Sequence, residues 1–156
     1  MNEWYRTFLE SYIKMNEEEH ECPPATQDVK LNTNNRDKAF KEEHIKYGPA
    51  NVDEPGSYYE DMAEYFDTTV EAVKGMKCSN CVAFDISPRI KECMPGSVQE
   101  DGELGYCWMH HFKCHSARTC YTWAAGGPIS DNAASYDWQK RNLKGALDKE
   151  PIEGAA

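Results

Sequence analysis

The chain is poor in aliphatic residues and has no long hydrophobic segment. Only five of its 156 residues are leucine, and the mean hydropathy is −0.81. Because no run of about 18 apolar residues occurs, no membrane-spanning helix is expected. The opening residues, MNEWYR, lack the basic and apolar regions of a secretory signal. We therefore expect a cytoplasmic protein or a component of an assembled particle, or a periplasmic protein if a signal has been removed.

Clusters of basic residues are also missing. Lys and Arg together number 17 against 27 Asp and Glu, which gives a formal charge of −10. A protein that binds nucleic acid through phosphates needs grouped cations, so nucleic-acid binding is not expected. An acidic surface favours solubility and would also suit a basic redox partner.

Motifs for covalent or nucleotide chemistry are absent as well. The sequence contains no catalytic triad pattern, no P-loop and no Gly-rich dinucleotide fingerprint. Pairs of carboxylates carry little information in a chain this acidic. We expect a protein that is not an enzyme.

Cysteine is the residue type that is present in excess. Four of the seven cysteines, Cys78, Cys81, Cys93 and Cys107, follow the spacing C-x2-C-x11-C-x13-C. Four thiolates suit a tetrahedral zinc ion or an iron–sulfur cluster. One short hook followed by two solitary cysteines favours the cluster, because structural zinc sites usually combine two hooks. In a reducing compartment, cysteines also indicate metal ligands more readily than disulfides.

The order of these residues resembles the high-potential iron–sulfur protein (HiPIP) family, over about residues 55–125. Members read approximately C-x-N-C, a third cysteine, a Pro-Gly turn and Gly-aromatic-Cys. The matching positions here are Cys78, Asn80, Cys81, Cys93, Pro95, Gly96, Gly105, Tyr106 and Cys107. The resemblance implies a small, loop-rich α+β domain. It also implies that Cys78, Cys81, Cys93 and Cys107 bind one [4Fe–4S] cluster for one-electron transfer.

The fourth ligand has a rival in Cys120. Family members usually carry a tryptophan three residues after the last ligand. His110 stands at that distance from Cys107, whereas Trp123 stands at that distance from Cys120. We favour Cys107 because Gly105 and Tyr106 precede it as the family pattern requires.

The remaining cysteines and histidines allow a second interpretation. Residues 107–115 read CWMHHFKCH and could hold zinc. The plainer interpretation has solvent-facing histidines and a Cys114–Cys120 pair that is either free or disulfide-bonded. Cys22 lies in a polar segment and is predicted to be a free thiol. The aromatic residues predicted to exclude water from the cluster are Phe84, Tyr106, Trp108 and Trp123.

Three segments are expected along the chain. Residues 1–55 contain an amphipathic helix over residues 3–18 and then an extended polar arm, with a weak indication of a short helix at 37–46. Residues 56–129 form the HiPIP-like domain, and residues 130–156 form a tail with one anchoring helix around Tyr136, Trp138 and Leu143.

Local signals within the predicted HiPIP-like domain indicate a few short elements. Residues 58–75 predict one or two helices, with an N-cap at 67–69 for the second. The best strand candidates are residues 82–84 and 121–123. The Gly126-Gly127-Pro128 sequence is expected to end the domain.

Two functions compete on this evidence. The first is a one-electron carrier with a HiPIP-like cluster. The second is a structural or assembly subunit, for example a virus-particle component, in which the cluster or a zinc ion stabilises a small fold. The arm would then bind a protein partner or other copies of the chain. A disulfide-bonded extracellular domain is a third, weaker alternative.

Overall fold

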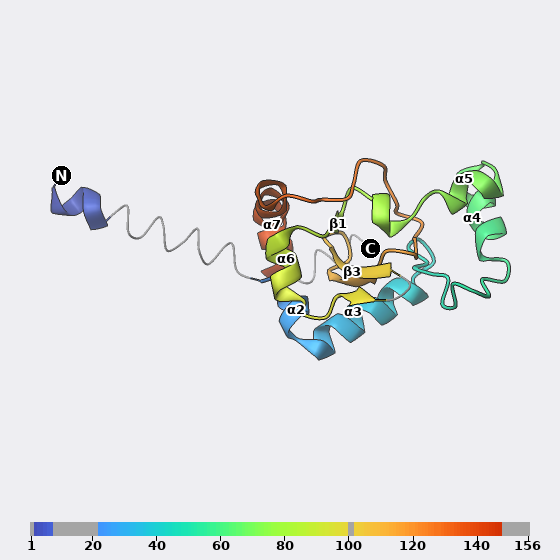
Figure 1. The fold of residues 1–156 in the computed structure, drawn as a ribbon, viewed down its shortest axis with the longest axis horizontal. Coiled ribbons are helices and arrows are strands. Elements are labelled where there is room, and N and C mark those ends of the chain that lie inside the picture. The colour runs from blue at the N-terminus through green and yellow to red at the C-terminus, as the bar shows by residue number, and fades with distance from the viewer. Residues whose placement is uncertain (1, 8–21, 100–101, 148–156) are drawn as a thin grey trace.

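The computed structural model describes residues 2–7, 22–99 and 102–147. Helices surround a small sheet of short antiparallel strands (Figure 1). The prediction of a small α+β fold is confirmed. Within the described part of the chain, no helix is long and apolar enough to span a bilayer.

Strand β3 (Gly102–Cys107) is the centre of the sheet. It pairs with β1 (Phe84–Asp85), β2 (Val98–Gln99) and β4 (Phe112–His115), in each case antiparallel. Gly105 is required where β3 passes β1, because a Cβ atom there would lie 2.5 Å from the Phe84 ring. The strand predicted at 82–84 is found at Phe84–Asp85. Residues 121–122 form a turn, and residue 123 has no regular secondary structure.

The segment predicted to be an extended arm is largely helical and packed. After α2 (Pro24–Gln27), helix α3 (Val29–Lys41) begins at Asp28, whose side chain accepts a hydrogen bond from the Leu31 amide. Helix α3 lies along β4, and the following Ile45 and Tyr47 are buried. The arm interpretation is therefore wrong for residues 22–49, and the short helix indicated at 37–46 is present only as the end of α3, which stops at Lys41.

Polar side chains explain how α3 docks with so few apolar residues. The Asn32 Oδ1 atom accepts a hydrogen bond from the Lys113 amide at 2.7 Å, and the Asn35 Nδ2 atom donates to the His111 carbonyl at 2.7 Å. The Tyr47 hydroxyl accepts from the His115 amide at 2.8 Å. These contacts satisfy the outer edge of β4, which would otherwise present unpaired backbone groups.

The amphipathic helix predicted for residues 3–18 falls mostly outside the described residues. Residues 3–7 are helical, and Trp4 is 72% exposed. Residues 8–21 are not described, so the predicted apolar stripe stays a prediction.

Helices α4 (Tyr58–Phe66) and α5 (Val70–Lys74) confirm the prediction of two helices over residues 58–75. The Thr69 hydroxyl accepts a hydrogen bond from the Ala72 amide at 3.1 Å, as the N-cap signal indicates. Met62 and Val73 are fully buried between the two helices, beside Tyr121. The pair forms a satellite at the opposite end of the sheet from α6 and α7 (Figure 1).

Helices α6 (Pro88–Cys93) and α7 (Asn132–Leu147) pack together at the other end of the molecule. The predicted helix in the tail is therefore present. A buried polar network joins it to the rest: Arg89 donates to Ser135 and Gln139, and the Ser135 hydroxyl lies 2.5 Å from Asp85. The core continues past Pro128, since the buried Ile129 donates its amide to the Phe84 carbonyl at 2.7 Å.

Candidate functional site: a buried cluster of free cysteines

Five cysteines with free thiols share one hydrophobic core. They are Cys78, Cys81, Cys107, Cys114 and Cys120. Phe84, Phe112 and Tyr47 pack in the same core, and each of the five cysteines is buried. Three of the four predicted ligands, Cys78, Cys81 and Cys107, are therefore brought together.

The fourth predicted ligand, Cys93, does not join them. Its sulfur forms a disulfide with Cys22, which lies 71 residues away in sequence. Cys93 ends α6 and packs in a separate core with Ile90, Met94 and Ala25. The prediction of Cys93 as a ligand is wrong in this structure, because a disulfide sulfur has no thiolate to offer. The prediction that Cys22 is a free thiol is wrong for the same reason.

The C-x2-C hook is a short 3₁₀ turn, η1 (Cys78–Asn80), that is held by Asn80. The Asn80 Oδ1 atom accepts hydrogen bonds from the Lys77 amide at 3.0 Å and from the Trp123 indole Nε1 at 2.9 Å. Its Nδ2 atom donates to the Gly75 carbonyl at 2.8 Å. The asparagine thus fixes the hook and joins it to the residue three positions after Cys120.

The backbone of the segment after β4 also runs against the hook. The Cys78 amide donates to the Arg118 carbonyl at 2.7 Å, and the Val82 amide donates to the Ala124 carbonyl at 2.8 Å. A Cβ atom at Gly127 would lie 1.7 Å from the Cys81 carbonyl oxygen, so only glycine permits this approach. Close backbone contact therefore sets the position of the hook relative to Cys120.

Strand alternation brings Cys107 and Cys114 to the same face of the sheet. In the β3–β4 register Cys107 lies opposite Phe112, and Gly105 lies opposite Cys114. The two cysteines are therefore diagonal neighbours. The sulfurs of Cys107 and Cys78 both raise the pKa of the Cys114 thiol, so Cys114 lies near the strand cysteine and near the hook.

The five thiols differ in acidity because their neighbours differ. A hydrogen bond from Cys114 lowers the pKa of Cys107 despite burial, and amides of His110 and Met109 act in the same direction. Burial raises the pKa of Cys114 well above its usual range, and the neighbouring cysteine sulfurs raise it further. Cys107 is the thiol that deprotonates most readily of this pair.

Cys81 and Cys120 are the other two buried thiols with polar groups near their sulfurs. Burial raises the pKa of both thiols. Backbone amides of Ala124 and Ala83 oppose that effect at Cys81, and Thr122 opposes it at Cys120, with its hydroxyl 3.0 Å from the sulfur. Donors aimed at sulfur are typical of metal-ligating cysteines, since they stabilise the thiolate.

In the described residues, no three His, Cys, Asp or Glu side chains are arranged to hold a metal ion. The chemistry of the donors nevertheless fits an iron–sulfur cluster: the site has more than four soft, buried thiols and amide donors near their sulfurs. A bound cluster would replace the thiol protons and the hydrogen bonds that the sulfurs make to one another.

The neighbouring histidines are not the solvent-facing residues that the sequence predicted. The His110 Nε2 atom lies 2.8 Å from the Thr122 hydroxyl, and the His111 Nδ1 atom lies 3.0 Å from the Tyr106 hydroxyl. Burial lowers the pKa of His110 to about 4 and also lowers the pKa of His111. Both are neutral near pH 7, and His115 is buried.

The predicted aromatic shell is half correct. Phe84 and Trp123 pack with the free cysteines, whereas Tyr106 and Trp108 belong to the core that contains the disulfide. Sequence reasoning missed Tyr47, whose ring contacts Phe112 at a centroid distance of 4.8 Å. Tyr47 stands more than 30 residues before the first clustered cysteine, and no spacing signal connects the two.

Comparison with known proteins gives no relative: no family model, no curated protein and no solved structure matches this chain.

Proposed function

We propose that the buried cysteines hold one [4Fe–4S] cluster in a HiPIP-like domain, and that the protein carries single electrons rather than catalysing a reaction. The ligands in this proposal are Cys78, Cys81, Cys107 and Cys120. The observation that carries it is that the five free thiols share one buried core, against which Trp123 packs.

Cys120 replaces Cys93 in the ligand set for two reasons. Cys93 is bonded to Cys22, whereas Cys120 is free and buried beside Cys78 and Cys107. Cys120 also carries the tryptophan three residues later that the family pattern calls for, at Trp123. Cys114 is left out of the proposed ligand set because burial and the neighbouring sulfurs raise its pKa well above its usual range, which makes its thiolate harder to form than that of Cys107.

A bound cluster would supply a one-electron couple, and the chain would set its potential. Phe84, Phe112 and Tyr47 exclude water from the sulfurs, which disfavours the more negatively charged state of a cluster. The amides near Cys81 and Cys107 favour added negative charge on sulfur. The balance of these opposing effects decides the potential.

A structural role is the second candidate, and one observation favours it. The five thiols come from η1, from β3, from β4 and from the segment after β4. A cluster or a zinc ion bound there would join four segments and contribute directly to folding. In this case the exposed Trp4 and Tyr5 are where we would look for a protein partner or for assembly into a particle.

The compartment is part of the proposal. The Cys22–Cys93 disulfide favours the periplasmic alternative over the cytoplasm, since disulfides persist where the environment is oxidising. Burial protects the five free thiols from oxidation in such a compartment.

The proposal is tested by iron, sulfide and zinc analysis of anaerobically purified protein, followed by voltammetry. About four irons per chain and a reversible one-electron couple are expected. Four irons without a reversible couple would favour the structural role, and stoichiometric zinc would move the site to a structural zinc centre. A protein that takes up neither metal, even after reconstitution, would refute the site.

A further inference from the structure

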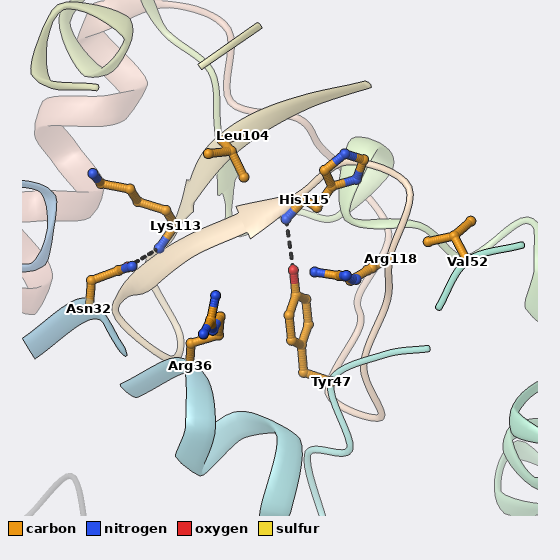
Figure 2. Close-up of a pocket in the computed structure, with 8 residues that line it drawn as sticks. All are labelled: Asn32, Arg36, Tyr47, Val52, Leu104, Lys113, His115 and Arg118. Carbon is orange, nitrogen blue, oxygen red and sulfur yellow. Dashed lines mark hydrogen bonds between the residues drawn. The ribbon is translucent and has the colours of Figure 1, made fainter. Parts of the chain in front are cut away.

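A second site lies on the opposite face of β4 from the free cysteines. It is a pocket of about 320 Å³ lined by Asn32, Arg36, Tyr47, Val52, Leu104, Lys113, His115 and Arg118 (Figure 2). Lys113 and His115 alternate along the strand with Cys114, which faces the cysteine core. We propose that this pocket binds a small molecule through a phosphate or carboxylate group.

The charge of the lining carries the proposal. Arg36, Lys113 and Arg118 all contribute to it, and no aspartate or glutamate does. This is an unusual concentration of positive charge in a chain whose formal charge is −10. Guanidinium and ammonium groups that converge on a concave surface are the usual means of binding carboxylates and phosphates.

Carboxylates of the described residues make only one long contact with these three cations. Arg118 donates to two neutral acceptors, the Pro49 carbonyl and the Ala50 carbonyl, both at 3.1 Å. Arg36 has one ion-pair partner, Asp37, at 3.8 Å, and both side chains are about half exposed. Lys113 forms no ion pair within the part of the chain that the structure describes. Three positive charges therefore remain largely available to a ligand.

The remaining lining residues define what else the ligand carries. The Asn32 Oδ1 atom is used by the Lys113 amide, which leaves the amide nitrogen of Asn32 to donate. Leu104, Val52 and the Tyr47 ring form an apolar wall. An anion with a small apolar body fits this combination better than a bare inorganic ion, because ligand sites combine apolar walls with a few placed polar groups.

The pocket is framed by regular structure. Arg36 and Asn32 come from α3, Lys113 and His115 from β4, and Figure 2 shows the side chains of Arg36, Tyr47 and Arg118 lying beside that strand. Because α3 is hydrogen-bonded to β4 through Asn32, the backbone positions that carry Arg36 and Lys113 are fixed relative to each other before a ligand arrives. Such preorganisation reduces the entropy cost of binding. The proposal does not depend on the cluster.

Calorimetric titration at constant ionic strength tests this site, with phenyl phosphate, benzoate and inorganic phosphate as probes. We expect phenyl phosphate or benzoate to bind more tightly than inorganic phosphate. Arg36→Gln and Lys113→Gln should each weaken binding about tenfold, which corresponds to about 1.4 kcal/mol. Lys140→Gln, on an exposed residue of α7, removes the same charge outside the pocket and should leave the affinity within about twofold.

Three results would overturn the proposal. The first is the absence of binding tighter than about 1 mM for every probe. The second is unchanged affinity in both pocket variants. The third is an equal loss in the Lys140→Gln variant, which would indicate a general charge effect. Circular dichroism of each variant ensures that lost binding is not lost folding, and Arg36→Lys, which keeps the charge, should recover part of the affinity. Preference for phenyl phosphate over benzoate would assign a phosphate ligand, and the reverse would assign a carboxylate.

Discussion

The two cores that meet at β3 use cysteine in opposite ways. In one, Cys107 and four other cysteines remain free thiols. In the other, which contains Tyr106, Cys22 and Cys93 form a disulfide. The disulfide joins α6 covalently to the segment just before α2. That core is therefore cross-linked without any bound metal or cofactor. The thiol core gains only the packing energy of its side chains until something bridges the sulfurs. This difference is why we propose the thiol core, and not the disulfide core, as the ligand site.

The largest expected effect is on iron content, and it should distinguish the proposed ligands from Cys114 within the thiol core. If the proposed ligand set is right, Cys107→Ser and Cys120→Ser should each reduce bound iron from about four per chain toward zero, because each removes one proposed cluster ligand. Cys114→Ser, the matched control, should keep its iron. Iron and sulfide analysis of the three variants is the measurement. Loss of iron in Cys114→Ser together with retention in Cys120→Ser would exchange the roles of these two residues.

Substitutions of the disulfide cysteines should lower the free energy of unfolding and leave the iron content unchanged. Cys22→Ser and Cys93→Ser each open a loop of 71 residues, and loop entropy predicts a loss of about 4 kcal/mol in the free energy of unfolding. Denaturant unfolding of both variants, with thiol counting under denaturing conditions, measures this loss. If Cys93→Ser lost iron and Cys22→Ser did not, Cys93 would be a ligand after all.

A buried carboxylate that joins the disulfide core to α7 should have a smaller effect. Asp85 is fully buried and accepts hydrogen bonds from the Trp108 indole and the Ser87 amide, both at 2.9 Å. Asp85→Ala leaves these donors without a partner and should cost about 3 kcal/mol in stability. Asp137→Ala, which removes an exposed carboxylate paired with Arg141, should cost less than about 1 kcal/mol. Equal losses would mean that the buried network does not hold α7 in place.

The smallest expected effect lies outside both cores. Thr69→Ala removes the N-cap of α5 and should cost about 1 kcal/mol. Thr68→Ala, at the exposed neighbouring position, serves as the control. Iron content should be unchanged in both variants. A loss of iron in Thr69→Ala would show that the α4–α5 satellite and the thiol core are coupled.

Elements with local signals were predictable, and those formed by distant contacts were not. Helices α4 and α5 follow from apolar spacing and from the Thr69 cap, which act within one turn. Of helix α3 the sequence indicated only the end, through the weak signal at 37–46, because asparagines rather than apolar side chains dock its first part against β4. Polar residues that satisfy a strand edge cannot be distinguished by composition from those of a solvated arm.

The candidate site divides in the same way. Spacing along the chain predicts the C-x2-C hook with its Asn80, because the hook is one short turn. It also predicts the tryptophan three residues after Cys120, because that offset is fixed. The choice between Cys93 and Cys120 depends on where α6 packs, and that is decided by Ile90, Met94 and the distant Ala25. The spacing between cysteines favoured Cys93 over Cys120 as a ligand. Spacing along the chain does not say where α6 packs, so it could not show that Cys93 lies in the other core.

The sequence by itself determined an acidic chain with a small α+β fold, a helix pair before the hook and a concentration of thiols suited to metal. Only the tertiary structure decided which thiols are free, which are cross-linked, and which cations meet in the pocket beside β4. The reason is physical: capping and periodicity act over a few residues, whereas a disulfide, a buried thiol cluster and a charged pocket require segments up to about 80 residues apart to pack against one another.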